Sequence, residues 1–209
     1  MPDQALLIVD LQNDFCPGGA LAVPEGDQVV APANRLADAF GCVLQTQDWH
    51  PPGHHSFASE HPGKEPMETA QMDYGEQTLW PDHCVQGSEG ARFHPDLDTR
   101  PTEAIFRKGF RPEIDSYSAF YENDHTTPTG LAGYLRERGT ERLFLCGLAA
   151  DFCVKWSVLD ACAEGFETVV VEDATRGIDA DGSLEAAWQE MAEAGATFAR
   201  SEEALEAAG

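Results

Sequence analysis

Lysine is scarce in this chain of 209 residues: only three lysines (Lys64, Lys108 and Lys155) stand among 13 basic residues, against 37 acidic ones. The resulting formal net charge of −24 argues against nucleic acid and anionic membranes as partners, because both repel an acidic surface. The acidic residues are spread along the whole chain. A solvated surface explains nearly all of them, and adaptation to high salt would produce the same pattern.

Long apolar runs and a basic leader are also missing. No stretch reaches the 18 apolar residues of a membrane span, and Met1 to Gln4 lead directly into a strand pattern, so we expect neither membrane insertion nor export. The cysteines include no CxxC pair, and three of them (42, 146, 162) lie in apolar runs or on a helical face, as reduced thiols do. These features predict a cytoplasmic protein without disulfides.

The length and a hydrophobic content of 42% allow one sizeable core, and we predict a single domain over residues 1–209. Continuous apolar runs alternate with helical patterns, which indicates parallel strands buried on both faces. The predicted fold class is α/β, in three layers (α/β/α) around a mostly parallel, Rossmann-like sheet of about six strands. The predicted strands comprise residues 5–10, 42–46, 104–109, 143–146, 168–171 and 197–199. Helices are predicted at residues 29–40, 130–138 and 184–193, and the run 147–154 opens a further helical pattern that continues through Cys162.

Residues 51–101 show no sustained periodicity and are rich in Gly, Pro, His and Asp. Loops of this length in compact domains are usually functional or disordered. The aromatic residues Phe57, Tyr74, Trp80 and Phe93 argue against disorder. We therefore expect this segment to carry part of a binding site.

Three chemically active side chains stand at the ends of predicted strands. Asp10 ends the first apolar run, and Lys108 lies near the end of the third strand. Cys153 follows the small residues Gly147, Ala149 and Ala150, in the run that opens a helical pattern. Ligands of open α/β sheets bind at this edge, and a helix start stabilises a thiolate and an oxyanion. A lysine beside the thiol should keep it ionised. Taken singly, each residue could equally be a turn aspartate, a strand-end lysine or a buried thiol.

A D-x-H pair, Asp48 and His50, follows the second predicted strand. In an extended segment both side chains point to one side, and a carboxylate with an imidazole suits Zn, Mn or Fe. By spacing alone, surface histidines in a Pro-rich loop are the commoner explanation. A third nitrogen could come from His54, His55, His61 or His83.

Together these residues resemble the nicotinamidases of the isochorismatase-like cysteine hydrolase superfamily, over almost the whole chain. Six motifs occur in the family order: IVDLQNDF (8–15), TQDWHP (46–51), LWPDHCVQG (79–87), FRKG (106–109), DSYSAF (115–120) and GLAADFCV (147–154). The resemblance implies the isochorismatase-like hydrolase fold. It also implies a metal-dependent amidase in NAD salvage that hydrolyses nicotinamide to nicotinate and ammonia through a cysteine acyl-enzyme, with pyrazinamide as a side substrate.

The resemblance assigns catalytic roles at the matching positions. Cys153 would attack the carboxamide, Asp10 would take and return the proton, and Lys108 would hold the pair in its ionised arrangement. The N–H groups of Ala149 and Cys153 would form the oxyanion hole, behind a cis peptide bond before Ala149. Ala150 departs from the family pattern, since many relatives carry Thr there.

The resemblance further implies one divalent metal ion, Zn with Mn and Fe as alternatives, bound by Asp48, His50 and His83. This ion would hold the pyridine nitrogen. His54 is a candidate for a further ligand, and His55 is equally close in sequence.

Phe15 and Trp80 would sandwich the substrate ring, with Tyr117 and Leu148 lining the pocket. Two other functions stay open: an amidase or ureidohydrolase of the same superfamily acting on an acyclic substrate, and a non-catalytic metal- or ligand-binding protein. The metal motifs argue against the first, and the intact catalytic residues argue against the second. A homo-oligomer is compatible with the sequence.

Overall fold

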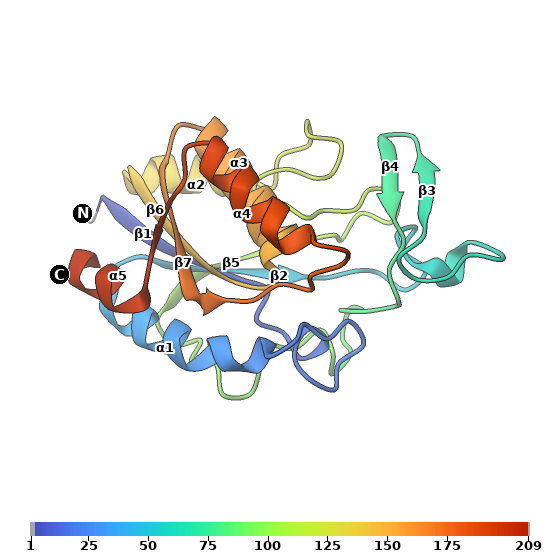
Figure 1. Ribbon diagram of the computed structural model, residues 1–209, viewed down its shortest axis with the longest axis horizontal. Coiled ribbons are helices and arrows are strands. Elements are labelled where there is room, and N and C mark those ends of the chain that lie inside the picture. The colour runs from blue at the N-terminus through green and yellow to red at the C-terminus, as the bar shows by residue number, and fades with distance from the viewer. Residues whose placement is uncertain (1–2, 209) are drawn as a thin grey trace.

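The computed structural model describes residues 3–208, which form three layers around a central sheet (Figure 1). The sheet has six strands in the order β5–β2–β1–β6–β7–β8, and every neighbouring pair is parallel. This arrangement confirms the predicted fold class. The strands are β1 (Gln4–Val9), β2 (Val43–Asp48), β5 (Thr102–Lys108), β6 (Arg142–Gly147), β7 (Glu167–Thr175) and β8 (Thr197–Ala199).

Helices cover both faces of the sheet (Figure 1). One face carries α1 (Val30–Ala39) and α5 (Ser201–Ala208), and the other carries α2 (Leu131–Arg138), α3 (Lys155–Ala163) and α4 (Ser183–Glu193). In α1 the buried positions recur at helical spacing, so that one apolar stripe faces the sheet. Each face thereby buries its own apolar cluster. The terminal helix α5 was not predicted.

The chain changes direction beside β1, and this change places the site. From β1 it runs outward to β2 and β5, then returns to β6 on the other side of β1. Such a reversal of strand order opens a crevice at the carboxyl ends of the central strands. Residues 5–9 are almost completely buried, so the crevice stands on a rigid base.

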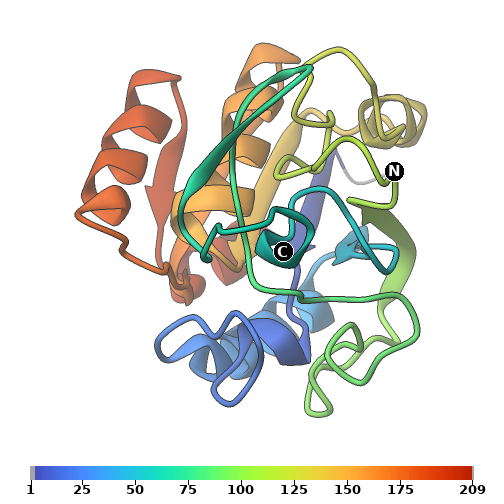
Figure 2. The ribbon, with the colours of Figure 1, turned by 90° about the vertical axis from the view of Figure 1, so that its right-hand side faces the viewer.

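The long segment after β2 contains a hairpin that the sequence did not indicate. Its strands β3 (Thr69–Met72) and β4 (Gly75–Thr78) pair antiparallel and stand beyond the carboxyl ends of the sheet (Figures 1 and 2). Short helical turns occupy residues 13–15, 26–29 and 58–60. Within the described residues no helix is both long and apolar enough to span a bilayer. All six cysteines are free thiols.

Candidate active site

Asp10, Lys108 and Cys153 meet at the carboxyl edge of the sheet. The ammonium Nζ of Lys108 lies 2.9 Å from Oδ2 of Asp10 and 3.4 Å from Sγ of Cys153. Lys108 reaches these groups from β5, across the intervening strand β2. All three side chains are buried. The structure thus brings together the three residues predicted from the strand ends.

The carboxylate of Asp10 is held in one orientation. Its backbone has a φ of 48° immediately after β1, a left-handed conformation that Asp tolerates better than most residues. The hydroxyl of Thr46 donates to Oδ1 of Asp10 (2.7 Å) and accepts from the Asp10 N–H (3.1 Å). Burial raises the pKa of Asp10, and the Lys108 ammonium lowers it by less. The carboxyl group is therefore suited to take up and hold a proton.

Cys153 lies in a π-helical turn, Ala150–Val154, rather than in the first α-helical turn that the sequence predicted; α3 begins at Lys155. Burial raises the pKa of the Cys153 thiol well above its usual range, and the Lys108 ammonium does not offset this effect. Lys108 itself is also bound by carboxylates, which raise its pKa well above the usual range although burial opposes them. The Lys108 ammonium lies beside the thiol as expected and lowers its pKa in opposition to burial. That Lys108 keeps the resting thiol ionised stays a prediction.

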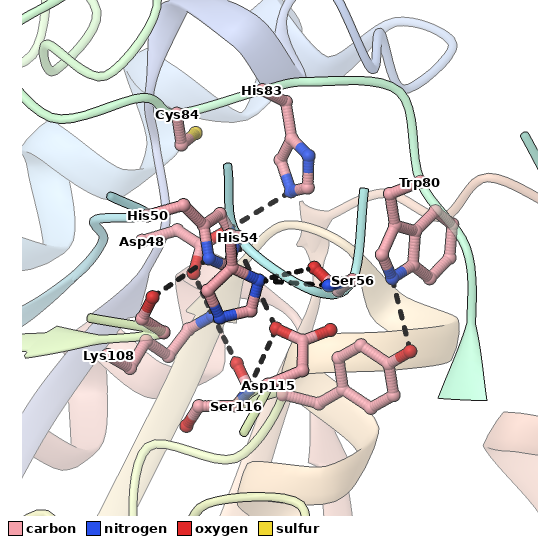
Figure 3. A network of polar contacts seen from close by, with 12 residues as sticks. Asp48, His50, His54, Ser56, Trp80, His83, Cys84, Lys108, Asp115 and Ser116 are labelled. Atoms are coloured by element: carbon pink, nitrogen blue, oxygen red, sulfur yellow. Dashed lines mark hydrogen bonds and ion pairs between the residues drawn. The ribbon is translucent and has the colours of Figure 1, made fainter. Parts of the chain in front are cut away.

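Asp48, His50 and His83 converge beside this triad (Figure 3). Oδ2 of Asp48 lies 2.9 Å from Nε2 of His50 and 3.2 Å from Nε2 of His83. The Nδ1 atoms of the two rings face the carbonyl oxygens of Gly109 (2.9 Å) and Pro81 (2.8 Å). Each Nδ1 therefore carries the proton, and each Nε2 turns a lone pair toward the carboxylate.

Lone pairs that face one another need a cation between them. A proton can serve at one ring: burial lowers the pKa of His50, but Asp48 outweighs this effect and the net pKa is raised. A divalent metal ion would satisfy all three donors at once, and the carbonyl partners already fix both imidazole tautomers as metal sites require. The residues present therefore fit the metal that the resemblance implied.

His54 lies next to this cluster but is bound elsewhere. Its Nε2 faces the carbonyl oxygen of Arg111 (2.8 Å), its Nδ1 faces Oγ of Ser56 (2.8 Å), and its ring centroid lies 4.4 Å from that of His50. His54 also forms a second group of candidate metal ligands with His50 and Asp115, so the further ligand predicted at His54 stays a prediction. His55 is exposed.

A cavity adjoins both groups of residues. Phe15, Trp80 and Tyr117 line it as predicted, and the Trp80 indole donates to the Tyr117 hydroxyl (3.1 Å). Leu148 was predicted to line the pocket, but its side chain is fully buried in the core beside α1 and does not line the cavity. The sequence did not indicate three further lining residues, Leu21, Phe152 and Ile178.

The backbone beside the nucleophile has the form that the resemblance implied. The Leu148–Ala149 peptide bond is cis. The next N–H group, that of Ala150, donates to the carbonyl oxygen of Arg176 (2.7 Å). The N–H of Ala150 is therefore already hydrogen-bonded within the fold. The N–H groups of Ala149 and Cys153 stay the predicted donors to the oxyanion.

Comparisons with known proteins agree with this geometry. The profile of the isochorismatase domain family matches residues 4–203. A nicotinamidase of Acinetobacter baylyi is 52% identical over 191 residues, covering 91% of this chain and 89% of the relative. A solved nicotinamidase and pyrazinamidase of Acinetobacter baumanii superposes with a TM-score of 0.95 at 54% identity, covering 96% and 97% of the two chains. A pyrazinamidase of Pyrococcus horikoshii in complex with zinc gives 0.78 at 36% identity, covering 95% and 99%.

Proposed function

This chain belongs to the isochorismatase family, and from that premise we propose that it hydrolyses nicotinamide to nicotinate and ammonia, with pyrazinamide as a second substrate. One observation carries the proposal: Nζ of Lys108 contacts both Asp10 and Cys153 at the wall of a cavity that also holds the metal cluster. The nicotinamidase of Acinetobacter baylyi, at 52% identity, and the solved nicotinamidase and pyrazinamidase of Acinetobacter baumanii, at 54%, support the proposal.

Cys153 supplies the nucleophile. Burial disfavours the thiolate of Cys153, so Sγ gives up its proton as it attacks the carboxamide carbon. Asp10 takes that proton, since burial makes its carboxylate a stronger base than an exposed one. The N–H groups of Ala149 and Cys153 receive the oxyanion of the tetrahedral intermediate.

Asp10 then returns the proton to the leaving nitrogen, and ammonia departs as the C–N bond breaks. A thioester between Cys153 and the nicotinoyl group remains. Water attacks this thioester while Asp10 accepts its proton, and breakage of the C–S bond releases nicotinate and restores the thiol. Throughout, the Lys108 ammonium offsets the negative charge that forms on either side of it.

Asp48, His50 and His83 would hold the metal ion, and the zinc complex of the Pyrococcus horikoshii relative supports zinc as its identity. Manganese and iron accept the same donor set. When bound, the ion supplies a Lewis acid for the ring nitrogen of the substrate. Phe15, Trp80 and the other aromatic side chains of the cavity wall exclude water around the ring.

We place the enzyme in the cytoplasm, where its free thiols stay reduced. There its product would enter NAD salvage. Its partner is the small-molecule substrate; the absence of nucleic acid and membrane partners, and the formation of a homo-oligomer, stay predictions.

Ammonia release from nicotinamide tests the proposal, with benzamide as the matched substrate because it lacks only the ring nitrogen. We expect turnover of nicotinamide, a specificity constant for benzamide lower by at least about 100-fold, and loss of activity with a chelator that zinc restores. Equal specificity constants for the two amides would contradict the role of the ring nitrogen. Absence of ammonia from nicotinamide would contradict the function itself.

A further inference from the structure

Asp151 is a buried carboxylate that the reaction scheme does not use. It stands two residues before Cys153, in the same π-helical turn, and its side chain is buried. Its oxygens accept three hydrogen bonds: from the N–H of Ile178 (3.0 Å), the N–H of Asp179 (2.8 Å) and the hydroxyl of Ser183 (2.5 Å). None of these donors is charged, and all three belong to the segment 176–183, which we name the latch segment.

These bonds matter energetically because a buried carboxylate loses its hydration. Without hydrogen-bond donors to replace the lost water, that loss destabilises the folded state. Bonds from neutral donors to a carboxylate are short and roughly twice as strong as neutral pairs. The charge of Asp151 therefore favours the one position of the latch segment in which all three donors reach it.

The latch segment also packs directly on the turn that carries the nucleophile. A Cβ atom at Gly177 would lie 2.6 Å from Cδ1 of Leu184 and 3.1 Å from Oδ1 of Asp151, so Gly177 packs closely against both side chains. The carbonyl oxygen of Arg176 accepts from the N–H of Ala150 at 2.7 Å. The segment and the turn consequently form one packed unit.

Ile178 is the residue of the latch segment that lines the active-site cavity. It also lines an open surface hollow whose other walls include Pro24 and Trp188. Ile178 therefore separates the substrate cavity from the surface. Its backbone N–H is one of the three donors to Asp151, so the carboxylate fixes this part of the wall.

We propose that Asp151 is a positioning residue that holds Ile178 against the cavity and thereby limits the ring substituents that the site accepts. This inference rests on the proposed function. In nicotinamide, C5 is meta to both the ring nitrogen and the carbon that bears the carboxamide. With those two points held at the metal cluster and at Cys153, C5 lies on the side of the ring away from both. Ile178 is one of the apolar residues of the cavity wall, and 5-methylnicotinamide is the probe that tests whether it limits this side of the ring.

The test compares Asp151→Asn with wild type on nicotinamide and 5-methylnicotinamide. The amide keeps one acceptor oxygen but turns an NH2 group toward the remaining donors, so the latch segment loosens. We expect KM for nicotinamide to rise about 5-fold with kcat within about twofold, and the kcat/KM ratio of 5-methylnicotinamide to nicotinamide to rise about 10-fold. Two further variants calibrate this test. Ser183→Ala removes one of the three donors and should shift the ratio less.

Asp181→Asn is the control: Asp181 is an exposed residue of the same segment, and this variant should keep wild-type kinetics.

Ile178→Ala tests the wall independently of the carboxylate, and it covers the case in which Asp151→Asn does not fold. It should raise the same ratio by about 10-fold; an unchanged ratio in Ile178→Ala would overturn the proposal. So would a lower kcat with an unchanged ratio in Asp151→Asn, since that pattern marks a purely structural effect. Amide hydrogen exchange at residues 178–179 should be faster in Asp151→Asn than in the wild type, and this measurement needs no substrate. It therefore tests the role of Asp151 even if the wild type does not hydrolyse nicotinamide and the proposed function is wrong.

Discussion

Asp48 and Lys108 join the metal cluster to the catalytic triad: Oδ1 of Asp48 lies 3.2 Å from Nζ of Lys108, while its Oδ2 faces the two imidazoles. Burial by itself would raise the pKa of Asp48, but His50 and Lys108 together lower it well below its usual range. The carboxylate is therefore ionised in both roles. One side chain thus links the candidate metal ligands to the lysine that contacts the thiol.

This shared carboxylate predicts different kinetics for two metal-site variants. His83→Ala should lose bound metal and mainly raise KM, because His83 contacts Asp48 on the side of the candidate metal ligands and not on the side of Lys108. Asp48→Asn should lose metal and also lower kcat by about 100-fold, since the amide no longer holds the ammonium. Elemental analysis and steady-state kinetics measure both effects.

His61→Ala is the control for these variants, because His61 bonds the carbonyl oxygen of His55 and is not part of the cluster. It should keep its metal and its activity. Identical kinetic defects in Asp48→Asn and His83→Ala would show that the contact with Lys108 has no catalytic consequence.

Glu122 predicts a pH dependence of stability that is separate from catalysis. Its carboxylate is buried, Nε of Arg111 lies 3.3 Å away, and burial raises its pKa from 4.5 to about 7. Between these two pH values the folded chain holds a proton that the unfolded chain has lost. The stability contributed by this group is therefore fully present below about pH 4.5 and is lost as the pH rises through about 7.

Glu122→Gln removes this titration while preserving size. Relative to the variant, the wild type should lose about 2 kcal/mol of unfolding free energy between about pH 5 and pH 8, after allowance for solvent screening. Urea unfolding of both proteins at the two pH values measures the difference, in which the titration of all other groups cancels. A difference that does not vary with pH would show that Glu122 is ionised in the fold.

The acidic surface predicts stabilisation by salt. With a net charge of −24, repulsion acts across the whole molecule at about 0.01 M salt, where the screening length is roughly 30 Å, and only between near neighbours at about 1 M. Tm should therefore rise with KCl, most steeply at the low end. Excess zinc at constant ionic strength is the control. If zinc raised Tm and KCl did not, metal loss rather than surface charge would limit stability.

The sequence predicted the sheet and the strand-end chemistry because both follow from local patterns. Residues 5–9 are apolar without alternation, as burial on two faces demands, and a polar residue that ends such a run must lie at the sheet edge. Asp10 and Lys108 were found in this way. Cys153 was found at the junction of a predicted strand and a helical pattern, and Asp48 and His50 as a D-x-H pair. The family motifs then selected His83 as the third metal ligand.

What the sequence did not predict depends on packing between distant segments. Ile178 reaches the cavity only because Asp151 holds its segment, and no motif includes it. Leu148 was placed in the pocket by its motif, yet its side chain turns into the core. The raised pKa of the Cys153 thiol is likewise a consequence of burial in three dimensions, which the sequence alone does not show.

The most direct test of the account is nicotinamide hydrolysis by Cys153→Ala, with Cys162→Ala as the matched control on α3. Cys153→Ala should fold and bind metal as the wild type does, release no ammonia above the uncatalysed rate, and form no nicotinoyl adduct in intact mass spectrometry. Cys162→Ala should remain fully active. Appreciable ammonia release by folded, metal-loaded Cys153→Ala would contradict covalent catalysis by this cysteine.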